Sequence, residues 1–322
     1  MAQGVPVQSQ KSFADSLMAE LRPRLREARK SWDLIRTNYT AMAGLFMVVF
    51  MVAVALLAPV LAPPTPFTDP LEIPRDWRFA NPIPPGAEGH VFGTGTNGLD
   101  MFYGVIWGAR TTLVSSLFVV LVSAIIGLAI GAVAGFYGGW IDEALMRITD
   151  VFLSLPALIL AMAITSVLTR SLNNIMLALI IVWWPGYARL MRGQVLIIRE
   201  SIYVEAARSI GARTSRILFR HIVPNSLSPL VVNVTLDLGA VALTMAGLSF
   251  IGFGVPSGFA EWGRMVSDGQ LWMPPIMVIY NGVEYNAWWT WAIPGLFILI
   301  FTMGFSLLGD GLRDILDPRT RR

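Results

Sequence analysis

The chain has 322 residues, of which 55% are hydrophobic and only 14% are charged, and its formal net charge is +3. Soluble domains are about 45–50% apolar and about 25% charged, so this composition excludes an ordinary soluble protein and a disordered chain. The absence of Cys excludes a disulfide scaffold, a thiolate metal site and a cysteine nucleophile. The composition predicts an integral membrane protein, with lipid around it and no nucleic-acid partner.

The basic residues also limit the chemistry that this chain can perform. Only two of the 24 are lysines, Lys11 and Lys30. Neither follows a glycine, so the chain lacks the Gly-Lys-Ser/Thr sequence of a phosphate-binding P-loop. His90 and His221 lie far apart in the sequence, which disfavours a histidine metal site. We expect no bound cofactor or metal and no ATP hydrolysis by this chain.

Residues 1–40 form a charged cytoplasmic segment ahead of the first apolar run. Apolar side chains recur there at spacings of four and three, which predicts an amphipathic helix with an interruption at Pro23. The helix either lies along the membrane surface or clasps a partner subunit. Its apolar positions are Leu17, Leu21, Leu25, Ala28, Trp32 and Ile35.

Runs of about 20 apolar residues cross a bilayer as helices. Six such runs predict an all-α membrane protein, with spans at residues 41–62, 112–136, 148–168, 174–190, 227–254 and 291–308. Pro185 and Gly186 interrupt the fourth run, which membrane helices tolerate where neighbours satisfy the backbone. The predicted organisation is a first span at 41–62, an outer loop at 63–109, a main transmembrane domain at 110–309 and a cytoplasmic tail at 310–322.

The distribution of Lys and Arg predicts the orientation of these spans. With the N-terminus inside, 19 of the 24 basic residues lie on the inner side. Because cytoplasmic loops carry the excess of Lys and Arg, both termini are expected in the cytoplasm of a multi-pass cell-membrane protein. The outer basic residues are Arg75, Arg78, Arg110, Arg170 and Arg264.

The inner segment at residues 191–226 is long, basic and helical in pattern. Residues 202–210 predict a helix that Gly211 ends, because glycine accepts the left-handed cap conformation. A second short helix is expected to follow, and Pro224 is expected to break it just before the fifth span. The segment is either a helix–turn–helix that another protein approaches closely, or a solvated basic loop that only fixes the topology.

A family resemblance rests on the residues of this inner segment. Glu205-Ala206-Ala207, Gly211 and the run at 221–225 resemble the EAA loop of ABC importer permeases. The wider sequence, over about residues 40–319, resembles the second (C-type) permease of dipeptide, oligopeptide and nickel importers. The matching segments include residues 90–94, 107–110, 135–140, 184–189, 248–254 and 309–314. The resemblance implies the six-helix fold of type I importer permeases over residues 110–309.

The resemblance also implies partners and a function. Such a permease forms half of a translocation path, pairs with a second homologous permease and receives solute from an extracytoplasmic solute-binding protein. Two ATP-binding subunits would carry the ATP and magnesium. The implied coupling surface consists of Glu205, Ala206, Ala207, Arg208 and Gly211, with Arg213 and Arg216 as weaker candidates. Movement of the ATP-binding subunits would reach the spans as a rigid-body displacement.

Peptides are the first expectation for the solute, with oligosaccharides and then nickel as alternatives. An intramembrane enzyme would need paired acids, Ser/His pairs or metal ligands within the spans. The only candidate acids are Asp150 and Asp237, and no His lies within a span, which opposes that class. A structural or assembly protein without transport is the remaining alternative.

Two features inside the spans are candidates for packing and for the path. Gly127, Gly131 and Gly135 form a stripe of small residues that lets another helix approach, either in the same chain or in the partner permease. Asp237 is the only acid well inside a span and either faces the translocation path or is paired near the span's inner third. Met245 occupies the position where the family usually has an acid, which makes it a second path candidate.

The outer segment at residues 255–290 and the start of the last span are rich in aromatic side chains. An aromatic belt at the membrane interface is the default interpretation. Docking of the binding protein and stacking against sugar rings are the alternatives. The residues are Phe259, Trp262, Trp272, Tyr280, Tyr285, Trp288, Trp289 and Trp291.

Overall fold

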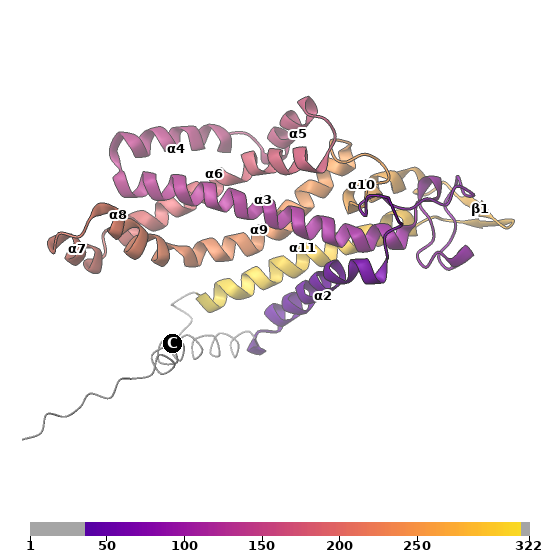
Figure 1. Ribbon diagram of the computed structural model, residues 1–322, viewed down its shortest axis with the longest axis horizontal. Coiled ribbons are helices and arrows are strands. Elements are labelled where there is room, and N and C mark those ends of the chain that lie inside the picture. The colour runs from indigo at the N-terminus through magenta and orange to yellow at the C-terminus, as the bar shows by residue number, and fades with distance from the viewer. Residues whose placement is uncertain (1–35, 317–322) are drawn as a thin grey trace, which may run out of the picture.

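The computed structural model describes residues 36–316, in which the long helices lie roughly side by side (Figure 1). Residues 1–35, which hold most of the predicted amphipathic helix, and residues 317–322 lie outside the described part. The helices are α2 (Tyr39–Leu61), α3 (Met101–Tyr137), α4 (Gly139–Leu153), α5 (Ala157–Val167), α6 (Leu172–Arg199), α7 (Ile202–Ser209), α8 (Thr214–Ile217), α9 (Val223–Ile251), α10 (Trp262–Gly269) and α11 (Trp289–Leu316).

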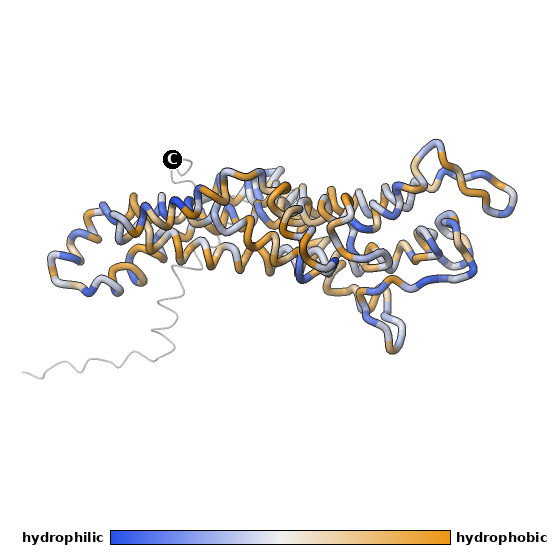
Figure 2. Tube along the Cα trace, turned by 90° about the horizontal axis from the view of Figure 1, so that it is seen from above, coloured by the Kyte–Doolittle hydropathy of each residue, from blue (hydrophilic) through white to orange (hydrophobic). Residues whose placement is uncertain are grey.

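The molecule has two polar ends and an apolar middle (Figure 2). Helices α7 and α8 lie at one end, and α10 and a β-hairpin lie at the other (Figure 1). We refer to these two ends as the α7 end and the hairpin end. Within residues 36–316, five helical segments are long and apolar enough to cross a membrane, and there are six if the bent pair α4–α5 is counted as one span. Five of the six predicted spans are therefore confirmed, one of them with a different start, and the predicted third span corresponds to the bent pair.

The third span is broken, whereas the sequence predicted one helix at residues 148–168. Helices α4 and α5 meet at an angle of 84°. Pro156 lies between them, and proline has no backbone N–H and disfavours helical geometry at the residue before it. The apolar run alone could not reveal this break.

The fifth span starts earlier than predicted, and Pro224 does not break it. One helical segment runs from Thr214 to Ile251. The residues Leu218–Ile222 form a π-helical turn, and Pro224 follows in the first turn of α9. A π turn widens the helix locally, so the proline ring is accommodated without ending the span.

The hairpin end also departs from the all-α expectation. Strands β1 (Val278–Tyr280) and β2 (Val283–Tyr285) pair antiparallel. Asn281 and Gly282 connect them and both have positive φ angles, of 53° and 79°. This is the Asn-Gly turn that two-residue hairpins prefer, because its twist matches that of the strands.

The packing of α3 against α6 depends on the three predicted glycines. Gly127, Gly131 and Gly135 all lie against α6, so the stripe packs within the chain. A Cβ atom at any of the three would lie closer than 3.0 Å to an atom of α6; for Gly131 the Cβ of Met191 would be 2.8 Å away. The backbones therefore approach more closely than any other residue type would allow.

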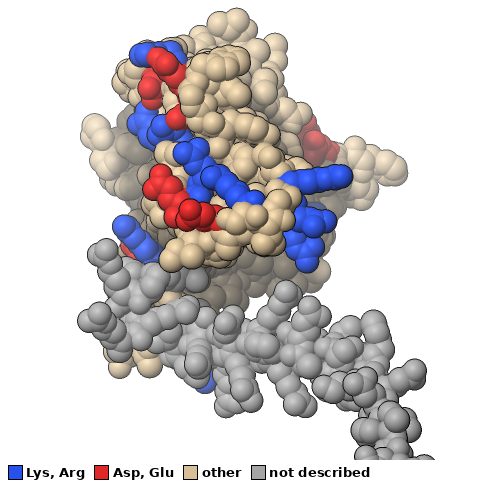
Figure 3. All heavy atoms as spheres, turned by 90° about the vertical axis from the view of Figure 1, so that its left-hand side faces the viewer, with Lys and Arg blue, Asp and Glu red and all other residues tan. Residues whose placement is uncertain are grey.

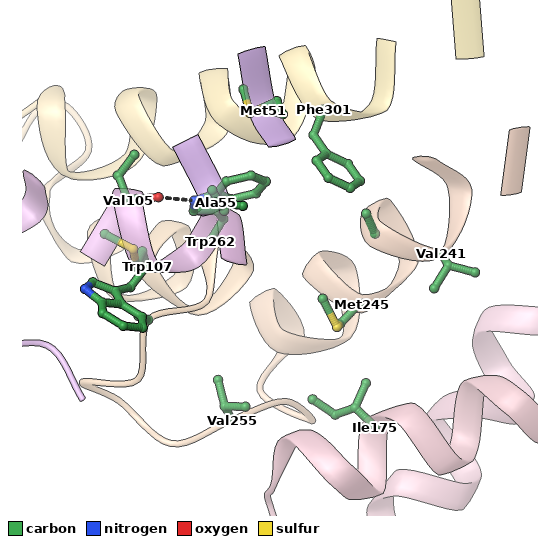
Figure 4. Packing of buried hydrophobic residues seen from close by; sticks show 14 of the residues in the cluster. Met51, Ala55, Val105, Trp107, Ile175, Val241, Met245, Val255, Trp262 and Phe301 are labelled. Atoms are coloured by element: carbon green, nitrogen blue, oxygen red, sulfur yellow. Dashed lines mark hydrogen bonds between the residues drawn. The ribbon is translucent and has the colours of Figure 1, made fainter. Parts of the chain in front are cut away.

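The hydrophobic core joins α2, α3, α5, α6, α9, α10 and α11 (Figure 4). Trp262 lies at its centre and is almost fully buried. Its indole N–H donates to the carbonyl of Val105 at 3.0 Å, which joins α10 to α3. The ring also packs edge-on against Phe301 of α11.

Several outer tryptophans tie loops together through their indole N–H groups. Trp289 is buried and donates its indole N–H to the carbonyl of Thr94 at 3.0 Å. Trp272 donates to the Thr96 hydroxyl at 2.8 Å. The aromatic-belt interpretation is therefore wrong for Trp262 and Trp289, because both rings are buried within the chain.

Substitution of Gly131 tests the close helix packing. Gly131→Ala is expected to lower the free energy of unfolding by about 1–3 kcal/mol, because the added methyl forces α3 away from α6. Gly193→Ala on α6 is the matched control, since nothing lies within 4 Å of a Cβ there. Thermal unfolding of the purified protein in detergent measures both changes, and equal effects would contradict the proposed packing.

Glu261 gives a pH-dependent test of the hairpin end. This fully buried carboxylate accepts from the backbone N–H groups of Gly263 and Arg264 at 2.9 and 2.8 Å, and burial raises its pKa. Between the usual glutamate pKa and the raised value, the folded state holds more protons than the unfolded state. The contribution of Glu261 to the free energy of unfolding therefore falls as the pH rises through that window.

Glu261→Gln is expected to flatten this part of the pH dependence. Melting temperatures of the wild type and the variant from about pH 5 to about pH 8 provide the comparison. The same slope in both proteins would show that Glu261 does not cause it.

Candidate functional site

Helix α7 connects the end of α6 to the start of α8 at one tip of the molecule (Figure 1). Gly211 follows it with φ +78°, the left-handed conformation that the sequence predicted. The N–H of Ala212 donates to the carbonyl of Ala207 at 3.1 Å, as in a Schellman cap. Glycine is needed at this position because an L side chain is strained at that φ.

One face of α7 is built into the chain's own core. Val204 and Ala207 are buried against the ends of α3 and α6, against α8 and against the π turn that precedes α9. This cluster, the α7-end core, consists of Ala132, Phe136, Val195, Val204, Ala207, Ile217, Leu218 and Ile222. Ala207 therefore faces inward and is not part of an exposed docking surface, in contrast to the prediction.

The opposite face of α7 is exposed and partly apolar. Glu205, Ala206 and Arg208 lie on the exposed side, as predicted for a coupling surface. Ile202 and Ile210 are 86% and 85% exposed and were not among the predicted residues. Together with Ala206 they recur every four residues, which places them on one stripe of the helix. In the sequence, Ile202, Ala206 and Ile210 are not at helical spacing from Val204, and this difference could have indicated a second, exposed face.

Charged side chains gather at the α7 end (Figure 3). Arg192 on α6 forms a two-point ion pair with Asp142 on α4, with one N–O distance of 2.6 Å. Arg189 pairs with Asp150 at 2.6 Å. These arginines, which the sequence suggested only as topology charges, hold α4 against α6.

Arg199 joins the ends of two helices. Its guanidinium donates to the carbonyls of Gly135 and Phe136 at 3.2 and 3.0 Å. The last carbonyls of a helix lack intrahelical partners, so an arginine there satisfies them and interacts favourably with the helix dipole. Arg199 thereby fixes the end of α6, and with it the base of α7, to α3.

A second candidate region is a cavity of about 260 Å³ between α6 and α9, beside the break between α4 and α5. Asp237 of α9 lies on its wall, together with Asn233 one turn away. The sequence singled out Asp237, and the structure places it at this hollow. The full lining is Leu153, Ala157, Val182, Trp183, Gly186, Tyr187, Leu190, Asn233 and Asp237.

Met245 does not share this environment. It has no exposed surface and packs within the hydrophobic core (Figure 4). A side chain enclosed by its own chain cannot border a path, so the predicted role of Met245 is wrong. Among residues 36–316, no group of three or more His, Cys, Asp or Glu side chains could hold a metal ion.

Comparison with known protein families identifies the architecture. Residues 127–322 match the family described as binding-protein-dependent transport system inner membrane component. Residues 28–85 match the N-terminal transmembrane domain of oligopeptide transport permease C. The chain belongs to this permease family.

Curated relatives cover nearly the whole permease. The dipeptide transport system permease protein DppC of Alkalihalophilus pseudofirmus is 36% identical, over 91% of this chain and 90% of the relative. The probable D,D-dipeptide transport system permease protein DdpC of Escherichia coli is 38% identical, over 92% and 93%. The oligopeptide transport system permease protein OppC of Bacillus subtilis is 37% identical, over 89% and 88%.

The fold of the permease is also that of a solved transporter. An inward-facing structure of the MetNI methionine ABC transporter matches with a TM-score of 0.52 and 22% identity. The match covers 67% of this chain and 98% of that chain. The permease is therefore a multi-pass inner-membrane protein with the fold of ABC importer permeases.

Adjacent alanines of α7 provide a test of its two faces. Ala207→Asp is expected to lower the free energy of unfolding by about 2–3 kcal/mol, because it buries a carboxylate in the α7-end core. Ala206→Asp lies on the exposed face and should change it by less than about 0.5 kcal/mol. Thermal unfolding in detergent measures both, and a reversed order would show that α7 is rotated from the position described.

Proposed function

We propose that this chain is the C-type permease subunit of an ATP-driven importer of di- and oligopeptides, and that α7 is its coupling helix. The relatives that carry peptide-transport names align with 86–94% of the chain at 36–38% identity. This near-complete alignment supports the peptide assignment. Nickel remains a weaker alternative, and no described residue favours it.

The observation that carries the coupling role is the two-faced character of α7. Its exposed stripe of Ile202, Ala206 and Ile210 is apolar and suits a groove on another protein. Its inner face is fixed to α3, α6 and α9 through the α7-end core. A displacement of α7 by an ATP-binding subunit would thus reach three spans at once as a rigid-body movement.

We also infer the orientation of the permease in the membrane. The α7 end faces the cytoplasm, because Arg192, Arg199 and the other basic residues of the inner segment lie there. Both termini are then cytoplasmic. The hairpin end faces outward, where a solute-binding protein would meet exposed side chains such as Trp77, Ile279 and Val283.

The proposed assembly contains this permease, a second homologous permease, two ATP-binding subunits and the binding protein. ATP and magnesium belong to the ATP-binding subunits, because this chain has no P-loop lysine. The permease itself is then not an enzyme. An oligosaccharide importer of the same architecture is less well supported, since Trp262 and Trp289 are buried and present no ring face for a sugar to stack on.

Substitutions on the exposed face of α7 test the coupling role. Ile202→Asp and Ala206→Asp are expected to abolish co-purification with the ATP-binding subunits, because a charge would be buried in the groove. Folding should persist, since both positions are exposed. Ile279→Asp on the exposed β1 strand is the control and should leave the assembly intact. Retained assembly and peptide uptake in both α7 variants would refute the docking role.

A further inference from the structure

The cavity at Asp237 contains a carboxylate without a charged partner. Among the described residues, no Lys, Arg or His side chain forms an ion pair with Asp237. Asp237 stands at the midpoint of α9 (Val223–Ile251), about 20 Å along the helix from either end. An acid at this depth is costly in a membrane and usually faces water, a partner or a transported solute.

The polar groups around Asp237 leave hydrogen-bonding capacity unused. The Tyr187 side chain is only 2% exposed, and its hydroxyl faces the Asp237 carboxylate without a hydrogen bond of ordinary distance and angle. The Asn233 amide nitrogen donates to the Pro229 carbonyl at 2.9 Å, and no hydrogen bond is formed by its oxygen among the described residues. A buried polar group without a partner is rare in proteins, and it is a reason to look for a bound species.

The rest of the lining favours a positive charge. The aromatic rings of Trp183 and Tyr187 form part of the wall, and ring faces attract ammonium and guanidinium groups. Asp237 and the Asn233 oxygen are hydrogen-bond acceptors, and the Tyr187 hydroxyl can also accept. The remaining wall is apolar and contributes no competing cation.

The broken third span gives this cavity its shape. Leu153 at the end of α4 and Ala157 at the start of α5 both line it. A continuous helix would carry side chains through this region, whereas the 84° bend turns α5 aside. Irregular backbone at membrane depth is tolerated where it is enclosed by protein or borders a water-filled cavity.

We propose that this cavity binds a positively charged group of the solute in transit, an ammonium or guanidinium, and so favours the passage of cationic peptides. The inference rests on the proposed peptide-import function. Asp237 would supply the compensating charge, Asn233 and Tyr187 would complete the hydrogen bonds, and Trp183 would cover the group with its ring. Binding at this cavity would act on the peptide after its release from the binding protein.

The test uses the complete importer in vesicles, with its partner permease, both ATP-binding subunits and the binding protein. Three tripeptides that differ only in one side chain (lysine, norleucine or glutamate) are supplied at concentrations that saturate the binding protein. Asp237→Asn is expected to lower the lysine-to-glutamate uptake ratio about tenfold, the scale of one charge-assisted hydrogen bond. Uptake of the neutral norleucine peptide should be retained, which a merely structural defect would not allow.

Asn233→Asp is the complementary variant, since it adds a second carboxylate to the same wall and should raise the ratio. This variant also tests the proposed cation binding if the Asp237→Asn permease fails to assemble. Glu143→Gln removes an exposed acid of α4 and serves as the control, with no expected change in the ratio.

An unchanged ratio in Asp237→Asn and Asn233→Asp, with all three peptides imported, would overturn this inference and leave the proposed function intact. Absence of peptide uptake by the wild-type importer would instead overturn the proposed function itself.

Discussion

The close contact between α3 and α6 is the constraint on which the rest of the permease depends. Three glycines bring the two backbones together, and no side chain separates them. In lipid, helices gain little from burying apolar surface against each other, so such close packing is a main source of attraction. The contact sets the position of α6, and α6 carries residues of both candidate regions, the cavity and the α7-end core.

The ion pairs at the α7 end follow from that contact. Arg192 and Arg189 reach Asp142 and Asp150 only because α6 lies beside α3, from which α4 folds back. The first pair is largely enclosed, whereas the second is more than half exposed and should contribute little to stability. The geometry suggests that these pairs fix the angle of α4, while the glycines fix the distance between the long helices.

Much of the fold could be predicted from the sequence because the membrane requires long apolar helices. The five long spans and the helix that ends at Gly211 followed from apolar runs and glycine chemistry. The break at Pro156 and the unbroken passage through Pro224 could not be distinguished in this way. A proline ends a helix or is absorbed by a π turn according to whether neighbouring backbone groups can be satisfied, and that depends on the tertiary structure.

The candidate regions were predictable to different degrees for a related reason. Asp237 stood out, because an acid inside an apolar run has few structural explanations. The inward orientation of Ala207 did not, because α7 carries apolar residues on both faces, with Val204 buried and Ile202 exposed. The burial of the tryptophan side chains was also not predicted. A tryptophan near the end of a span looks the same in the sequence whether it faces lipid or donates to a carbonyl within the protein.

The two candidate regions are linked by one continuous helix. Trp183 and Tyr187 of α6 line the Asp237 cavity, and Val195 lies two turns farther along the same helix, in the α7-end core. A helix of this kind transmits displacement along its axis with little compression, because each turn is hydrogen-bonded to the next. The opposite wall includes the break between α4 and α5, which has no such continuity. A movement at α7 would therefore shift one wall of the cavity against the other, which is the geometry that a coupling helix needs to change access to a binding site.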